Sequence, residues 1–224
     1  MRPGEPGAGN TSNAPRTFAA LVTRERRRHI ERMILALFLL LLSAAWRIAA
    51  LHVPALFNFA PLMALTFCGA VYFRDKRMWF VPFGALILSD IYLNHYHATV
   101  YNEGWTWGGM VVRAACFAVA LPLGAWVSRH KGWLTLFGGA LAGSVLFYLV
   151  TNTEAWLRDP AYAKTVAGWW QAITVGRPEF PSTLWFFRNT LASDLLFTGV
   201  FAVAMESAAV RAGRGSLFAK PTEA

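Results

Sequence analysis

Five charged residues stand inside long apolar stretches of the 224-residue sequence: Arg47, Asp90, Arg113, Arg188 and Asp194. A charged side chain within a bilayer is costly, so such residues face the protein interior or a wet cavity and pair where they can. A rise of about 1.5 Å per helical residue places all five in the same half of the bilayer or at its centre. Two carboxylates and three guanidinium groups at this depth can hold helices together or bind a polar solute.

Both interpretations follow from the residues alone. In the first, Asp90 and Asp194 pair with two arginines, and the third arginine extends its charge to the membrane surface. In the second, the charges and nearby amides form a polar cup that opens to the outside. Its arginines would receive a carboxylate or phosphate group, and its aspartates would orient the arginines. The predicted polar cup consists of Arg47, Asn58, Asp90, Arg113, Asn152, Arg188, Asn189 and Asp194.

Histidine and cysteine side chains raise a further chemistry, because imidazoles and thiolates bind transition metals and haem iron. His95 and His97 flank a tyrosine, but two residues apart on a helix their rings diverge by roughly 200°. His52 is a third imidazole near the same surface, and Cys68 is a candidate axial ligand near the membrane centre. Interfacial packing of the histidines and burial of the thiol explain these residues more simply, so we expect no metal site.

Catalytic sequence patterns are also missing from the chain. The sequence contains no G-x-S-x-G, H-E-x-x-H or P-loop pattern. We therefore expect that the protein is not an enzyme and that any energy for its work comes from a partner.

The elements that would position these residues are membrane-spanning helices. The chain is 56% hydrophobic and only 15% charged, whereas a typical soluble domain has about 25% charged residues. A spanning helix needs about 20 apolar residues, and the apolar runs here lack the alternation of barrel strands. The sequence predicts an all-α polytopic membrane bundle with six transmembrane helices. These helices are Met33–Leu51, Pro54–Phe73, Met78–Asn94, Trp107–Val127, Trp133–Thr151 and Thr183–Met205.

Lysine and arginine are distributed unevenly among the predicted loops. If the N-terminus is cytoplasmic, 15 of these residues lie on the cytoplasmic side and three lie outside. Cytoplasmic loops of membrane proteins carry this excess. We therefore expect a multi-pass protein of a bacterial inner membrane with both termini inside. The net charge of +9 is then mostly a signal of topology, and we expect no nucleic-acid partner.

The predicted domain organisation has three parts. Residues 1–32 form a disordered, basic cytoplasmic head, residues 33–205 form the transmembrane domain, and residues 206–224 form a cytoplasmic tail. Residues 152–181 form a long outer connection, which is either a lid over the polar cup or a segment resting on the lipid head groups. Within it we expect an interfacial helix whose apolar face contains Val166, Trp169, Trp170 and Ile173.

Four segments stand in a characteristic order: NFAPLMALTFCGAVYF (58–73), VPFGALILSDIYL (81–93), GSVLFYLVTNTEAWL (143–157) and FFRNTLASDLLFT (186–198). They resemble the motifs of an uncharacterised family of bacterial six-span membrane proteins, which has no activity to carry over. In size, number of spans and orientation, that family resembles the S-components of energy-coupling-factor vitamin transporters. The resemblance implies a protein that binds a vitamin from the outer side, under loops between spans.

The function predicted from these observations is a membrane-embedded subunit that binds and takes up a small, vitamin-like solute. That solute would be its bound molecule, and the lipid bilayer its surroundings. The alternative is an accessory or structural subunit of a larger membrane protein complex. Its partners would then be other membrane subunits, and its intramembrane charges would serve helix packing only.

Overall fold

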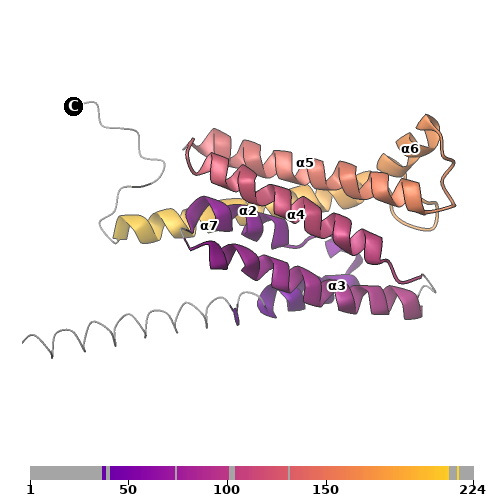
Figure 1. Cartoon of the computed structure of the whole chain (residues 1–224), viewed down its shortest axis with the longest axis horizontal. Coiled ribbons are helices and arrows are strands. Elements are labelled where there is room, and N and C mark those ends of the chain that lie inside the picture. The colour runs from indigo at the N-terminus through magenta and orange to yellow at the C-terminus, as the bar shows by residue number, and fades with distance from the viewer. Residues whose placement is uncertain are drawn as a thin grey trace, which may run out of the picture. The chain divides into compact units, whose positions relative to one another are not determined.

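The computed structural model describes residues 37–38, 41–73, 75–100, 104–130, 132–211 and 216. The chain forms two compact units, 1–38 and 39–224, and the second contains every feature discussed below. Among the described residues all regular elements are helices, as predicted, and there is no strand (Figure 1). Residues 41–49 are helical. The other elements are η1 (Ala50–His52), η2 (Pro54–Leu56), α2 (Leu62–Tyr72), η3 (Lys76–Phe80), α3 (Val81–Val100), α4 (Trp107–Val127), α5 (Trp133–Arg158), α6 (Val166–Ile173) and α7 (Thr183–Arg211).

Helix α2 forms the centre of the bundle because it is apolar on every side, and nine of its eleven residues are buried. It packs mainly against α4 and α7, and also against α3 and α5. Two glycines allow this close approach. A Cβ atom at Gly124 of α4 would lie 2.5 Å from the carbonyl oxygen of Phe67, and one at Gly139 of α5 would lie 2.8 Å from the Phe67 ring.

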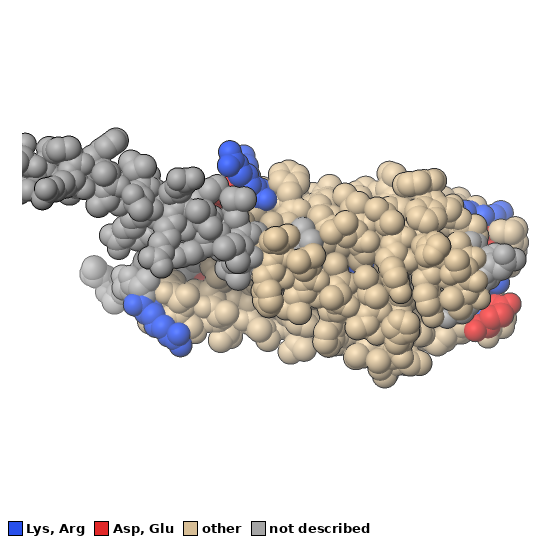
Figure 2. Space-filling model, turned by 90° about the horizontal axis from the view of Figure 1, so that it is seen from below, with Lys and Arg blue, Asp and Glu red and all other residues tan. Residues whose placement is uncertain are grey.

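Three helices, α4, α5 and α7, are long and apolar enough to cross a membrane. Figure 2 shows a broad uncharged surface, with most of the visible charged side chains near the two ends. These features support a membrane protein, but the predicted number of six spans goes beyond them. Helix α2 has 11 residues and is about 16 Å long, roughly half the thickness of a bilayer core. Helix α3 has 20 residues, but its second half mixes apolar residues with Asn94, His95 and His97.

The predicted span Pro54–Phe73 is wrong in its first half. Pro54 begins the single turn η2, and Pro61 directly precedes α2. Between them, Asn58 adopts a left-handed backbone conformation with φ of 62°. Because proline lacks an N–H group and restricts the residue before it, a continuous helix cannot run through this segment. The chain therefore forms only short helical turns between His52 and Pro61.

Other predicted boundaries agree in part. Helix α4 has the predicted ends, Trp107 and Val127. Helix α5 continues to Arg158, so residues 152–158 belong to a helix and not to the lid. Helix α7 continues to Arg211, so the predicted tail begins as helix. The predicted head, 1–32, lies outside the described residues, as do most of the tail and the first part of the span Met33–Leu51.

The predicted helix in the outer connection is present as α6, at one end of the bundle (Figure 1). Its four apolar residues are spaced as one helix face requires, but they differ in exposure. Val166 and Trp170 are exposed, whereas Ile173 is buried and Trp169 donates a hydrogen bond from Nε1 to Thr153 Oγ1 of α5 at 3.0 Å. Helix α6 is therefore attached to α5 through Trp169, while Val166 and Trp170 of the same apolar face stay exposed.

Candidate functional site

A buried carboxylate joins three helices in the interior of the bundle. Asp90 of α3 is 1% exposed and accepts hydrogen bonds from two arginines. Arg47 binds one carboxylate oxygen through Nη1, and Arg113 of α4 binds the other through Nε at 2.8 Å. The same Nη1 of Arg47 lies 2.8 Å from the hydroxyl oxygen of Ser89. This arrangement matches the interpretation in which intramembrane charges hold helices together.

The charges continue from this cluster towards α5. A Cβ atom at Gly109 would lie 3.3 Å from Arg113 Nη1 and 3.8 Å from Glu154 Oε2, so these two side chains approach the same point. Glu154 in turn accepts a hydrogen bond from Arg158 Nε at 3.0 Å. Positive and negative groups therefore alternate from the helix over 41–49 to the end of α5. Glu154, which the prediction omitted, is the second acidic member of this series.

Asp194 lies apart from the arginines. It is 1% exposed on α7 and accepts a hydrogen bond from Ser144 Oγ of α5 at 2.6 Å. The backbone N–H of Ala64, in the first turn of α2, also lies near the carboxyl group. No lysine or arginine among the described residues forms an ion pair with Asp194, so its predicted pairing with an arginine is wrong. The void beside it measures about 10 Å³, roughly the space for a single water molecule.

Arg188 and Asn189 of α7 serve different purposes. Arg188 is exposed, with its guanidinium carbon 5.4 Å from the centroid of the Trp185 ring, and forms no ion pair with a described residue. The buried Asn189 donates hydrogen bonds from Nδ2 to the carbonyl oxygens of Ala55 and Phe57, both at 3.0 Å. Asn189 thereby satisfies the backbone of the irregular segment before α2 and is not available to a solute.

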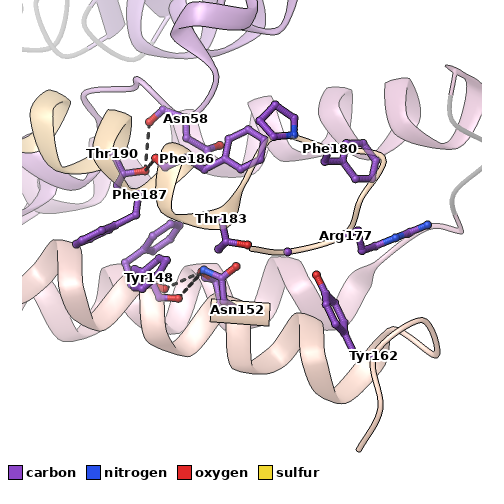
Figure 3. Close-up of a pocket in the computed structure, with 14 residues that line it drawn as sticks. Asn58, Tyr148, Asn152, Tyr162, Arg177, Phe180, Thr183, Phe186, Phe187 and Thr190 are labelled. Atoms are coloured by element: carbon purple, nitrogen blue, oxygen red, sulfur yellow. Dashed lines mark hydrogen bonds between the residues drawn. The ribbon is translucent and has the colours of Figure 1, made fainter. Parts of the chain in front are cut away.

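A pocket of about 280 Å³ lies at the α6 end of the bundle, between α5, the start of α7 and the connection from α6 to α7 (Figure 3). Of the eight predicted cup residues, only Asn58 and Asn152 line it. The pocket is mixed in character, with aromatic, amide, hydroxyl and guanidinium groups. Its lining residues are Asn58, Phe147, Tyr148, Thr151, Asn152, Tyr162, Gly176, Arg177, Phe180, Pro181, Thr183, Phe186, Phe187 and Thr190.

One wall of the pocket is aromatic. The rings of Tyr148 and Phe187 are stacked, with centroids 4.3 Å apart and planes inclined by 29°. The side chains of Asn152 and Thr183 lie beside this pair, and Tyr162 stands across the space from them (Figure 3). Tyr162 is 7% exposed, and burial, followed by the negative charge of Asp159, raises the pKa of its phenol.

The connection between α6 and α7 closes over this wall because of one glycine. Gly176 has φ of 78°, and a Cβ atom there would lie 2.6 Å from Thr183 Oγ1. Gly176 also donates its N–H to Gln171 O at 2.8 Å and accepts from Gln171 Nε2 at 3.2 Å. The turn after α6 is therefore anchored to α6 itself, which brings the next residue, Arg177, to the pocket.

A model of a family of unknown function, DUF6580, matches residues 27–216. The chain belongs to this family. The match includes the Asp90 cluster, Asp194 and every residue of the pocket. It confirms the predicted membership of an uncharacterised family, and it gives no support to the resemblance to S-components. Neither the curated proteins nor the solved structures contain a match.

The candidate metal ligands of this DUF6580 chain do not converge. Within the described part of the chain, no three His, Cys, Asp or Glu side chains could hold a metal ion together. His52 packs edge-on against Tyr96, with ring centroids 5.9 Å apart. Cys68 is fully buried in α2 as a free thiol. His95 and His97 lie on either side of Tyr96 in α3, and the His97 ring lies 6.2 Å from the Tyr96 ring.

Residues of the outer connection are the part of the pocket that the sequence interpretation omitted. Within the segment GRPEFP, residues 176–181, Gly176, Arg177, Phe180 and Pro181 all line the pocket. One feature of the sequence could have indicated this part of the pocket. It is a glycine that can adopt a positive φ, followed by an arginine and an aromatic residue, in a loop between two helices of the DUF6580 chain.

Proposed function

We propose that the protein is a membrane-embedded small-solute binding protein whose site is the pocket at the α6 end of the bundle. The observation that carries this proposal is the pocket itself, with about 280 Å³ of space and a lining that is both aromatic and polar. Binding sites for small molecules are usually concave and mostly apolar, with a few polar groups that fix orientation. A volume near the lower end of their usual range favours a small ligand.

The orientation of the bundle supports access from outside the cell. The loops away from α6, around 73–81 and 128–132, contain most of the loop lysines and arginines between the helices. By the positive-inside rule this end faces the cytoplasm of a bacterial inner membrane, with both termini on that side. The pocket then faces outward, and the connection from α6 to α7 acts as its cover.

Uptake of a vitamin-like solute is the specific form of this function that we favour. The pocket contains no arrangement of a nucleophile with a general base, and the fold offers no nucleotide-binding loop among its described residues. The protein would therefore capture its solute and depend on a partner for energy. The predicted arginine cup is replaced in this proposal by the pocket, because Arg47 and Arg113 are bound to Asp90.

Native mass spectrometry of the protein purified in mild detergent tests the proposal. We expect a stoichiometric extra mass in the unmodified protein and its loss in Thr151→Phe, whose ring would fill the pocket. Thr99→Phe is the matched control, because Thr99 is exposed near the end of α3 and away from the pocket. A bound mass that survives Thr151→Phe, in a protein with unchanged melting temperature, would contradict a site in this pocket.

An accessory subunit of a larger membrane complex is the second candidate, and one observation favours it. The Asp90 cluster is satisfied entirely by residues of this chain, so the intramembrane charges are explained by packing alone. Under this proposal the exposed Val166 and Trp170 of α6 would contact another subunit. Purification without a small molecule but with stoichiometric partner chains would support this candidate over solute binding.

A further inference from the structure

The charge balance of the pocket limits the kind of molecule that it can bind. Its 14 lining residues, all of them described, include no aspartate or glutamate and a single cation, Arg177. That guanidinium is already engaged on two sides, since Nη1 lies 3.4 Å from Asp159 Oδ2 and Nε lies 3.3 Å from Glu179 Oε2. Its carbon also lies 5.6 Å from the centre of the Phe180 ring. Neither an anionic nor a cationic ligand would find an unpaired counter-charge there.

Three polar side chains of the pocket each use one hydrogen-bond donor within their own helix. Asn152 donates from Nδ2 to the carbonyl oxygen of Tyr148 at 2.7 Å, and Thr151 donates to the carbonyl oxygen of Phe147 at 2.7 Å. Thr190 donates to the carbonyl oxygen of Phe186 at 3.2 Å. Each of these hydrogen bonds uses one donor within its own helix, and Nδ2 of Asn152 keeps a second N–H. What remains for a ligand on these three side chains is the Oδ1 atom and one N–H of Asn152, and the lone pairs of the two hydroxyl groups.

Shape adds a further restriction. The stacked rings of Tyr148 and Phe187, with Phe147 and Phe186 beside them, give the pocket flat apolar surfaces. Aromatic rings favour offset stacking or edge contact with another flat ring. A flat ligand can therefore cover this wall while its polar edge reaches Asn152 (Figure 3).

We infer that the ligand of the pocket is an uncharged, flat molecule that offers both an N–H donor and a carbonyl acceptor along one edge, as a primary aromatic amide does. This inference rests on the proposed solute-binding function and specifies its ligand class. Asn152 Oδ1 accepts a hydrogen bond from the ligand. The hydroxyl groups of Thr183 and Tyr162 can rotate, and they form further hydrogen bonds with the polar edge of the ligand. Ionised vitamins and phosphorylated compounds are disfavoured by the same argument, because the positive charge of Arg177 is already balanced by the nearby carboxylates of Asp159 and Glu179.

Four small probes of nearly the same shape test the inference: benzamide, acetophenone, benzoate and benzamidine. They are respectively a neutral donor, a neutral molecule without a donor, an anion and a cation. We expect benzamide to bind about tenfold more tightly than each of the others in calorimetric or ligand-detected NMR titrations of the purified protein, which is the difference that one or two hydrogen bonds provide. Tightest binding of benzoate or benzamidine would overturn the inference.

A pair of variants connects the selectivity to the pocket. Asn152→Leu keeps the size of the side chain and removes the acceptor, so benzamide should lose its advantage over acetophenone. Thr99→Val, outside the pocket, should keep it.

A charged probe that binds, and is excluded by Thr151→Phe, would overturn the ligand class and leave solute binding intact. No probe binding together with no co-purified mass would overturn both. If only a co-purified molecule is found, its charge and its donors decide the ligand class.

Discussion

At the scale of single residues, Asp90 is the most consequential side chain in the bundle. It lies between two arginines from two other helices, and each of its oxygens is bound by one of them. Removing the partner of buried charges is far more damaging than removing a surface ion pair. We expect Asp90→Asn to leave Arg47 and Arg113 as neighbouring like charges and to lower the free energy of unfolding by about 3 kcal/mol. Thermal unfolding in detergent measures this change.

Asp75 provides the matched control for Asp90→Asn. It lies at the start of η3, where its side chain accepts a hydrogen bond from the Arg77 N–H at 3.0 Å, and it is exposed. Asp75→Asn removes the same charge at the surface and should change the melting temperature little. Equal stability of the two variants would show that the Asp90 ion pairs do not hold the bundle together.

Tyr162 has a pKa raised mainly by burial, which makes a prediction about alkaline conditions. In the folded protein the phenol keeps its proton above pH 10, whereas in the unfolded chain it ionises near pH 10. Its contribution to stability is therefore complete below pH 10 and is lost as the pH rises further. We expect the melting temperature to fall more steeply between about pH 9 and pH 11 in the unmodified protein than in Tyr162→Phe. Parallel slopes would contradict the burial of this phenol.

At the scale of helices, the contact between α2 and α4 depends on the absence of a side chain at Gly124. A Cβ atom there would lie 2.5 Å from the Phe67 carbonyl oxygen and 2.8 Å from the Ala70 Cβ atom. Because a backbone atom cannot rotate away, the two helices would have to separate. We expect Gly124→Ala to lower the free energy of unfolding by about 2 kcal/mol, as overpacking does in other cores.

Gly138 of α5 is the control for this substitution, because a Cβ atom at this position meets nothing within 4 Å. Alanine is also favoured over glycine within a helix by roughly 0.5–1 kcal/mol. Gly138→Ala should therefore leave the melting temperature unchanged or raise it slightly. If both glycine variants behave alike, close packing of α2 on α4 is not what limits stability.

At the scale of the whole molecule, the orientation in the membrane can be tested with single cysteines. Cys68 and Cys116 are both buried and free, so they give little background labelling. Ala161, beyond α5, and Arg129, beyond α4, are exposed at opposite ends of the bundle. In intact cells we expect a membrane-impermeant maleimide to label Ala161→Cys and not Arg129→Cys. The reverse pattern would place the pocket on the cytoplasmic side.

Much of the fold could be predicted because apolar run length decides where long helices form. Helix α4 has the predicted ends, and the break around Pro54 and Pro61 was visible in the chemistry of proline. Helix ends set by local packing were not visible, as the extension of α5 to Arg158 shows. Sequence periodicity placed Val166 and Ile173 on one face of α6, but it could not show that Ile173 is buried and Val166 is exposed.

The candidate site was less predictable because pairing is a property of three dimensions. Depth along a helix identified Asp90 and Asp194 equally well, but only the arrangement of helices shows that Asp90 has two arginines and Asp194 has Ser144. Asn58 and Asn152 were predicted as cup residues, and both line the pocket. The other residues that line the pocket were not predicted. The aromatic and loop residues that complete the pocket carry no charge signal in an apolar sequence.

The Asp90 ion pairs also have a consequence for how the protein enters the membrane during its synthesis. Arg47 emerges from the ribosome 43 residues before Asp90, and Arg113 emerges 23 residues after it. An unpaired arginine within a bilayer costs roughly 2.5–3.5 kcal/mol on insertion scales. The helix over 41–49 therefore gains little by moving into lipid alone. In the six-span arrangement predicted from the sequence, this helix is expected to stay beside the insertion machinery until α3 and α4 have been synthesised, so that the three helices enter the bilayer together.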